Sequence, residues 1–476
     1  ILVTSLFNRC TDHVDYEAIE GYQITSEIYF QQEADYDAAL VGTYDVLQWL
    51  FFNIQLGAIA SEITLCGGES ATDYIGIQQI DDMTHYPENN VLRQIWQFLY
   101  EGVNRANYME ENKANIDFEG KEAMYGEVYF LRAYYYFELV KFFGDVPLFT
   151  EARLTAGQAG TLTRTPKDEV YAQIELDLQN AIASLPNSQS QVGRVNKYTA
   201  YALLGKVLLY QDKFAEAASA LDNVIGVYSL VSDYGSQFLR FGENGPESVF
   251  EIQYSNQSNW YDWGCVHCSE GNYAIIMNGP RGWSGPEYAQ GWSFNVPTEE
   301  FYNSFEEGDS RRDATVLDIE AFAAATGSSY TEGYDHTGYF NNKYIPRAGE
   351  SGGQTELNYL TNFRIIRYSD VLLMAAEAYN RGGIDDGLAQ EFLNQVRRRA
   401  FGGDDNDISA SGSALTDAIW EERKFELSLE GHRFFDLVRT GRASSLIAGF
   451  VEGKHEVFPI PQQEVDISGL TQNAGY

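Results

Sequence analysis

Apolar residues recur every three or four positions along most of the first half of the chain. Between residues 35 and 60 the recurring positions are Tyr36, Ala39, Leu40, Thr43, Tyr44 and Leu47. This period is typical of an amphipathic helix. The same reasoning predicts helices over residues 91–112, 121–143 and 165–185, with a Gly- and Pro-containing loop over 64–90. The pattern therefore predicts a mainly α-helical protein.

Two pairs of short helices resemble tetratricopeptide repeats. The first pair covers residues 199–210 and 214–225, where Leu204, Gly205, Ala217 and Leu221 fall close to the repeat spacing. The second covers 368–381 and 388–399, with Ala376, Tyr379 and Phe392 in corresponding places. Small residues at Gly205 and Ala217 let paired helices approach closely. We expect an α-α superhelix of stacked repeats, about 35–228 and 364–440.

A long insertion, about residues 230–360, separates the two helical regions. Residues 247–254 alternate between apolar and polar, which predicts a strand. After that, Gly, Asn, Ser, Trp and Tyr dominate without a helical period. Loops carried on a rigid frame are where binding residues usually lie. The insertion is thus the expected ligand-binding region.

The segment 419–441 is rich in both charges and aromatic rings. It reads as two helical pieces on either side of Gly431. Charges this dense beside apolar residues must be paired if they are buried. We interpret the segment as a structural core of ion pairs that touches no ligand.

Several short motifs, in order along nearly the whole chain, resemble the SusD/RagB family of surface glycan-binding lipoproteins in Bacteroidetes-type bacteria. Each match is short, but the ordered set is specific. The motifs are Phe130-Leu-Arg-Ala133, Phe142-Phe-Gly-Asp-Val-Pro-Leu148, Pro297-Thr-Glu-Glu-Phe301, Ile366-Arg-Tyr-Ser-Asp-Val-Leu-Leu-Met-Ala-Ala-Glu-Ala-Tyr379, Asn394-Gln-Val-Arg397, Glu422-Arg-Lys-Phe-Glu426, Glu430-Gly-His-Arg433, Phe435-Asp-Leu437 and Phe458-Pro-Ile-Pro461.

The resemblance implies one SusD-like domain over residues 21–476. It also implies a non-catalytic capture subunit at the outer membrane. This subunit would bind polysaccharide or oligosaccharide and deliver it to a SusC-like, TonB-dependent transporter, with its helical repeats facing that partner. A branch of the same family captures peptides, which is the alternative function.

Residues 1–20 resemble the remnant of a lipoprotein signal followed by a tether. An apolar run ends at Cys10, and the family resemblance implies that Cys10 is acylated and anchors the protein to the membrane. Arg9 stands where a small residue normally precedes the cysteine. The alternative is an N-terminal tail with a buried free thiol.

Net charge narrows the ligand class. The chain carries 69 acidic against 32 basic residues, a formal charge of −37. This charge opposes nucleic-acid binding, which depends on phosphate neutralisation by Lys and Arg. It also disfavours polyanionic glycans. We expect a neutral glucan or mannan.

The first candidate binding segment is Asn259, Trp260, Tyr261, Asp262 and Trp263. A sugar ring has an apolar C–H face that a flat aromatic ring can contact, and an equatorial belt of hydroxyls that Asp and Asn can bind. Five residues that interleave both kinds suit this need. The alternative is that the rings form the loop's own small core.

A second candidate comprises Arg281, Trp283, Tyr288 and Trp292 on a Gly- and Pro-shaped loop. The Arg281 guanidinium can bridge adjacent hydroxyls, and Trp283, between Gly282 and Ser284, is the ring we expect to be more exposed. Structural packing of most of these rings is the alternative. The loop around Asp73, Tyr74, His85 and Tyr86 is a third expected contributor.

No metal, cofactor or catalytic motif is recognisable in the sequence. Cys265 and Cys268 lack a second pair for structural zinc, which leaves a local disulfide or two free thiols. The acidic run Asp404, Asp405 and Asp407 suggests calcium but lacks an EF-hand pattern, so we read it as a solvated loop. Nucleophile, zinc-protease and phosphate-loop motifs are absent. Non-catalytic binding is therefore favoured over glycoside hydrolysis.

Overall fold

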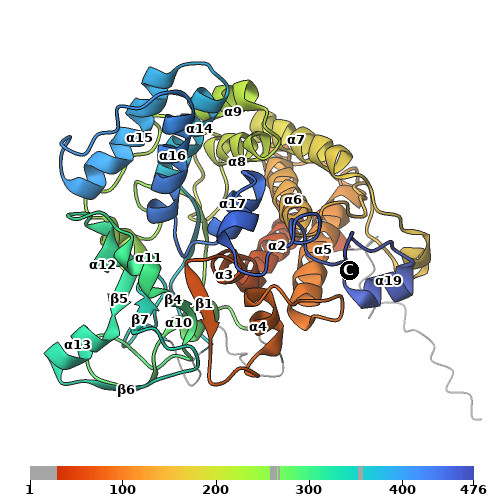
Figure 1. The fold of residues 1–476 in the computed structure, drawn as a ribbon. Coiled ribbons are helices and arrows are strands. Elements are labelled where there is room, and N and C mark those ends of the chain that lie inside the picture. The colour runs from red at the N-terminus through yellow and green to blue at the C-terminus, as the bar shows by residue number, and fades with distance from the viewer. Residues whose placement is uncertain (1–28, 258–264, 266–267, 352–356) are drawn as a thin grey trace, which may run out of the picture.

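The computed structural model describes residues 29–257, 265, 268–351 and 357–476. This part of the chain is mainly α-helical, as predicted. A curved stack of helices forms one side, and a region of short strands, short helices and loops lies beside it (Figure 1).

The N-terminal helical region differs from the single helix predicted over residues 35–60. Helix α2 (Glu33–Asp45) passes into a 3-10 turn, η1 (Val46–Trp49), and then into α3 (Phe51–Ile59). Val46, Leu47, Trp49 and Leu50 are all buried. One straight helix would place part of this apolar run on its solvent face, and the turn avoids that exposure.

Successive helices then pack on one another in chain order. Short helix α4 comes first, after which α5 packs on α6, α6 on α7, α7 on α8 and α8 on α9. Their bounds are Ile75–Asp81 (α4), Asn90–Glu111 (α5), Lys121–Phe143 (α6), Lys167–Ser184 (α7), Lys197–Leu209 (α8) and Phe214–Asp222 (α9), with a 3-10 turn η2 at Ala156–Thr161. A Cβ added at Gly205 would lie 2.5 Å from the Leu221 side chain. The predicted close approach of α8 and α9 through Gly205 is confirmed.

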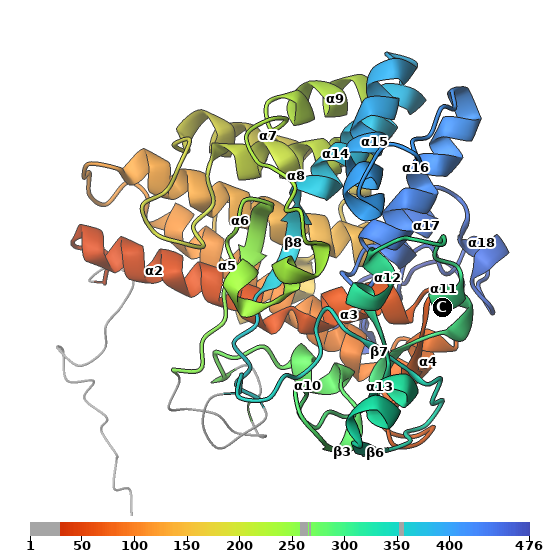
Figure 2. The same ribbon diagram turned by 90° about the vertical axis from the view of Figure 1, so that its left-hand side faces the viewer.

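The chain leaves the stack after α9 and returns to it at α14, which packs directly on α9 (Figure 2). Helices α14 (Tyr368–Arg381), α15 (Asp386–Phe401) and α16 (Gly412–Glu426) extend the stack. Three shorter helices complete the C-terminal region: α17 (Arg433–Arg439), α18 (Ala443–Leu446) and α19 (Gln462–Ser468). The predicted scaffold interrupted by an insertion is thus observed.

The insertion contributes strands to four antiparallel pairs in the described residues. Strand β2 (Ser248–Ile252), which confirms the predicted strand, pairs with β8 (Phe363–Arg367). The others are β1 (Thr64–Gly67) with β4 (Phe294–Pro297), β3 (Arg281–Ser284) with β6 (Ser329–Thr331), and β5 (Val316–Asp318) with β7 (Tyr339–Asn341). Its short helices are η3 (Tyr234–Phe238), η4 (Arg240–Gly242), α10 (Ala274–Asn278), α11 (Glu299–Asn303), α12 (Arg311–Thr315) and α13 (Ile319–Thr326). The β1–β4 pair joins the early loop to the insertion.

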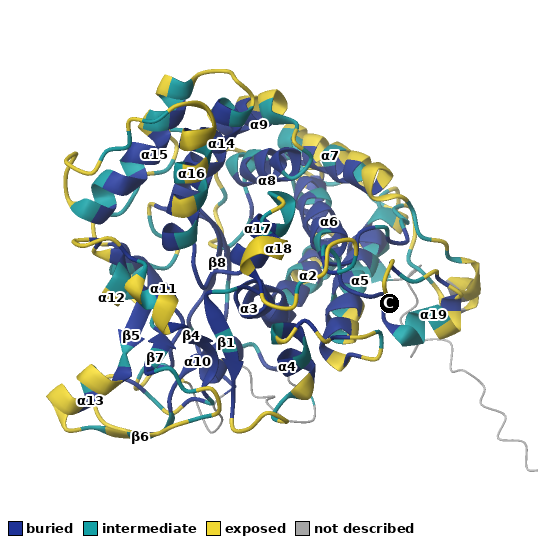
Figure 3. Ribbon diagram, in the orientation of Figure 1, coloured by how far each residue is buried: buried dark blue, intermediate teal, exposed yellow. Residues whose placement is uncertain are grey.

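The charged C-terminal segment is the buried ion-pair core that its sequence predicts (Figure 3). Arg367 of β8 lies 2.7 Å from carboxylate oxygens of Glu247, Glu426 and Glu430. Burial alone would raise the pKa of Glu426, yet its three arginine neighbours, Arg399, Arg367 and Arg311, hold it well below the usual range. These pairs fasten the insertion to α16 and the turn before α17.

Candidate functional site

A row of aromatic rings runs between the scaffold and the insertion. Neighbouring ring centroids lie 4.3–6.3 Å apart, and each contact is edge-on or tilted. In spatial order the row consists of Trp292, Tyr273, Phe51, Phe52, Tyr74 and Phe294. We call this set the aromatic row.

Trp292 at one end of the aromatic row and Tyr74, next to Phe294 at the other end, reach the protein surface. Tyr74 and Trp292 are half-buried, whereas Tyr273 and the three Phe rings are buried. Burial raises the pKa of the Tyr74 and Tyr273 hydroxyls, so both stay neutral and able to donate a hydrogen bond. Each surface ring is therefore supported from behind by packed aromatic neighbours, which fixes its orientation.

Polar groups lie beside Tyr74 in the aromatic row. The Arg281 guanidinium donates to Asp73 Oδ2 at 2.9 Å, and Glu69 is 3.6 Å away. Asp73 Oδ2 also accepts the backbone N–H of Glu69 at 2.8 Å, which closes the turn before α4. The guanidinium is partly exposed. A forked donor and a fixed acceptor thus stand next to an oriented ring.

Backbone bonds hold the two site segments in place. The Gly68 N–H donates to the Ser293 carbonyl at 2.7 Å, beside the β1–β4 pair. Tyr74 adopts a left-handed conformation with φ of 48° immediately before α4. This uncommon conformation turns the ring toward Phe52 and Phe294.

The expectation that Trp283 is exposed is wrong. Its side chain is only 9% exposed and packs with Tyr288, Phe340 and Ile345 in a core of the insertion. Trp283 lies on β3, where successive side chains point to opposite faces. The exposure of Gly282 and Ser284 therefore places Trp283 on the inner face. Tyr288 is also buried, and this burial raises its pKa to about 12.

Some of the other candidate residues from the sequence lie at the site, and others do not. Asp73, Tyr74 and Arg281 come together, and Trp292 lies at the other end of the aromatic row. His85 is buried with its Nε2 2.7 Å from the Tyr476 hydroxyl. Burial, with the neighbouring His455 and Lys454, lowers the pKa of His85 to about 3. Asn259, Trp260, Tyr261, Asp262 and Trp263 lie outside the described residues, as does Cys10.

Sequence reasoning missed Tyr273. Its neighbours in sequence, Asn272 and Ala274, carry no cluster of rings or charges that would single it out. Its place in the aromatic row depends on Phe51 and Trp292, from distant parts of the chain. The sequence also does not predict the ion pair between Asp73 and Arg281, because each is an ordinary charged residue in its own loop.

The structure also shows the state of Cys265 and Cys268 and the contacts of Asp407 in the acidic run. Cys265 and Cys268 form a disulfide, one of the two alternatives left by the sequence. Asp407 is paired with Arg398 at 2.6 Å. Among the described residues, no group of three or more His, Cys, Asp or Glu side chains is arranged to hold a metal ion.

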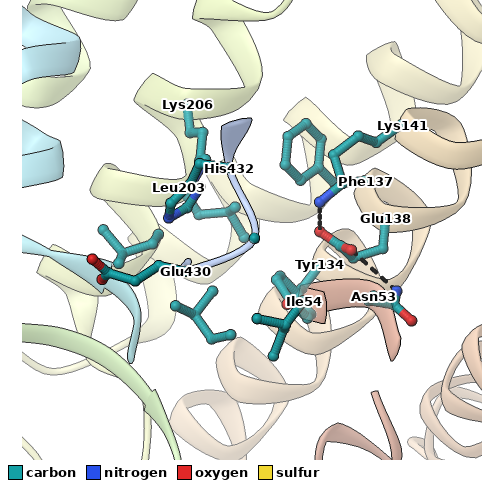
Figure 4. Close-up of a pocket in the computed structure, with 13 residues that line it drawn as sticks. Asn53, Ile54, Tyr134, Phe137, Glu138, Lys141, Leu203, Lys206, Glu430 and His432 are labelled. Atoms are coloured by element: carbon teal, nitrogen blue, oxygen red, sulfur yellow. Dashed lines mark hydrogen bonds and ion pairs between the residues drawn. The ribbon is translucent and has the colours of Figure 1, made fainter. Parts of the chain in front are cut away.

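A small cavity of about 30 Å³ lies between α3, α6, α8 and the turn before α17 (Figure 4). Its charged lining is paired: Lys141 is 2.5 Å from Glu138, which also accepts from Asn53 at 3.1 Å. The space suits about two water molecules. It is too small for a sugar ring, so we assign it to the structural core.

The fold and the site together define a tetratricopeptide-like scaffold whose loop-rich insertion presents supported aromatic rings. The chain belongs to the SusD family. Residues 246–454 match the family model described as "SusD family", and residues 61–209 match a second one described as "Starch-binding associating with outer membrane". The resemblance to SusD/RagB proteins is thereby confirmed.

Similar proteins cover nearly the whole chain. SusD-like protein P2 from Formosa agariphila is 29% identical, over 95% of this chain and 94% of its own length. A structure titled "Laminarin binding SusD-like protein" is 36% identical with a TM-score of 0.86, covering 94% of this chain and all of the other. Surface glycan-binding protein A from Bacteroides thetaiotaomicron, solved in complex with laminarihexaose, is 29% identical with a TM-score of 0.83, covering 93% and 99%.

In the described part of the chain, every helix is too short or too polar to cross a bilayer.

Proposed function

We propose that this protein binds a neutral glucan of the laminarin type at the cell surface and does not cleave it. The observation that carries the proposal is the 36% identity and TM-score of 0.86, over 94% of the chain, to the laminarin-binding SusD-like protein. The laminarihexaose complex of a second relative supports the same ligand class.

The site chemistry agrees with a neutral sugar chain. Glucose rings offer C–H faces to Tyr74 and Trp292, and their hydroxyls can accept from Arg281 and donate to Asp73. Because the Asp73 carboxylate is already bonded to a guanidinium and a backbone N–H, it acts as a fixed acceptor. We propose that residues 259–263 also contact the glucan. The charge of −37 disfavours acidic polysaccharides.

Family membership also supports two further parts of the proposal, attachment to the membrane and delivery of the glucan to a transporter. The second matching family model is described as associating with the outer membrane. We propose acylation of Cys10 as the anchor and a SusC-like transporter as the partner that receives the glucan. Cys10→Ser should release the protein from the membrane fraction of cells. Continued membrane association of that variant would contradict the anchor.

Affinity electrophoresis tests the ligand. The purified protein is run in gels that contain laminarin, mannan, starch or an acidic polysaccharide such as alginate. We expect retardation by laminarin and none by alginate. Chromatography of laminarihexaose incubated with the protein should show no shorter products. Retardation by alginate alone, or release of shorter sugars, would overturn the proposal.

A further inference from the structure

A groove separate from the aromatic row lies between α2 and β2. It has a volume of about 530 Å³, within the range of ligand pockets. Past a strap formed by residues 192–194 it continues into a second hollow of about 270 Å³. Val192, Gly193, Arg194, Glu251 and Gln253 line both hollows.

Two exposed apolar side chains line the groove. Val41 of α2 is 51% exposed and Val192 of the strap is 73% exposed. The strap packs closely on the side chain of Gln253, the residue after β2, because a Cβ at Gly193 would lie 2.4 Å from Gln253 Cγ. Gly193 also has a φ of +86°, which favours glycine. The groove therefore has defined apolar walls on a rigid support.

The polar lining consists mainly of hydrogen-bond acceptors. Gln48 donates through Nε2 to the Gln253 carbonyl at 2.9 Å, while its Oε1 is buried without a partner among the described residues. Glu270 adds a carboxyl group. The Glu270 carboxyl is half-buried and bonded to the Gln48 side chain, which holds it in place. Ligand hydroxyl groups can donate to this carboxyl from the groove.

The edge of β2 does not favour a peptide ligand. Strand addition requires free backbone groups along the edge. The carbonyls of Val249, Glu251 and Gln253 already accept from the side chains of Thr199, Gln253 and Gln48, at 3.0, 3.2 and 2.9 Å respectively. A ligand that brings hydroxyls rather than an extended backbone fits this edge better.

The charges disfavour an acidic ligand. Arg194 is the cation at the groove, and it is bonded to Asp37 at 2.7 Å and lies 3.4 Å from Glu127. Glu251 and Glu270 add negative charge. The lining thus suits a neutral compound with many hydroxyls and some apolar surface, which describes a neutral saccharide.

The groove and the aromatic row share one run of the chain. Gln48 lies on η1, three residues before Phe51 of the row, and Figure 2 shows α2 leading toward α3. We infer that the groove between α2 and β2 is a second subsite, which binds further hexose units of the same neutral glucan held at the aromatic row. This inference rests on the proposed function.

Calorimetric titration with laminarin and with laminaritriose tests the subsite. Two changes remove its features: the double variant Val41→Glu/Val192→Glu alters the apolar walls, and Glu270→Ala removes the half-buried acceptor. Val451→Glu is the matched control, since Val451 is 52% exposed and lies outside the groove. Thermal melts verify that each variant is folded.

We expect both groove changes to weaken laminarin binding measurably, by up to about tenfold. Laminaritriose binding at the aromatic row should stay unchanged. The control should match wild type with both sugars. If the folded groove variants bind laminarin with wild-type affinity, the second subsite is wrong while the proposed function stands. If the wild-type protein binds neither sugar, the proposed function fails and the subsite fails with it.

Discussion

Asp73 and Arg281 lie 208 residues apart in the sequence, and their Oδ2 and Nη2 atoms are 2.9 Å apart in the structure. This contact joins the loop before α4 to strand β3 of the insertion. It also sets the turn that carries Tyr74. One ion pair therefore links the turn that carries the half-buried Tyr74 ring to the guanidinium beside it.

Arg281→Ala should weaken laminarihexaose binding by about 1–2 kcal/mol, since it removes a charged donor and releases the Asp73 turn. Stability should change by less than about 1 kcal/mol, because the pair is partly exposed. Arg312→Ala is the control, as Arg312 forms an exposed pair with Asp313 away from the site. Equal binding by both variants would exclude a role for Arg281.

Trp292 and Trp283 should respond oppositely to truncation. Trp292→Ala should weaken glucan binding by about 1–3 kcal/mol, because it removes a surface ring. Trp283→Ala should lower the free energy of unfolding by about 3–5 kcal/mol, because it empties a core position, with binding by the folded protein largely retained. Calorimetry and urea unfolding measure the two effects. A binding loss confined to Trp283→Ala would reverse our assignment.

Gly57→Ala should destabilise the protein severely. A Cβ at this position of α3 would lie 2.0 Å from the Gly431 carbonyl oxygen, so two backbones must separate. We expect a loss of about 3 kcal/mol or more in the free energy of unfolding. Gly42→Ala on α2 is the control, because its nearest neighbour is an Arg105 side-chain atom at 3.9 Å. The control should be neutral or stabilising.

Asp81 should make stability depend on pH. Burial raises its pKa to about 7, and the nearby Asp82 and Asp335 add to the rise although the Cys66 N–H opposes it. The folded-state pKa therefore exceeds the ordinary unfolded value of about 4. The contribution of Asp81 to stability is complete below about pH 4 and is lost as the pH rises through about 7.

Asp81→Asn keeps an acceptor for the Cys66 N–H at every pH. Its melting temperature should exceed that of wild type at pH 8, and the difference should shrink toward pH 5. Thermal melts of both proteins between pH 5 and pH 8 measure this difference in melting temperature. A constant difference would show that Asp81 titrates normally in the folded state.

Local periodicity predicted the scaffold well. The helix over residues 121–143 coincides with α6, and the one over 368–381 coincides with α14, because each has consistent apolar spacing and clear ends. The prediction of one helix over residues 35–60 was wrong in the middle, because the apolar residues around Leu47 are buried on several sides. Pairwise spacing around Gly205 also predicted a true helix contact.

The site was harder to predict because it is assembled from distant segments. Trp283 was misjudged because small neighbours suggest exposure in a loop, whereas in a strand they indicate that the intervening ring faces inward. Tyr273 and the Asp73–Arg281 pair depend on tertiary contacts that no short motif encodes. Trp292 was chosen as a candidate from its residue type, and its role in binding stays a prediction.

Calorimetric titration of the purified protein with laminarihexaose tests the central claim most directly, with the sugar recovered afterwards and its length determined. We predict saturable heat from binding and recovery of the intact hexasaccharide. Absence of heat at millimolar sugar, or recovery of shorter fragments, would contradict non-catalytic glucan binding by this protein.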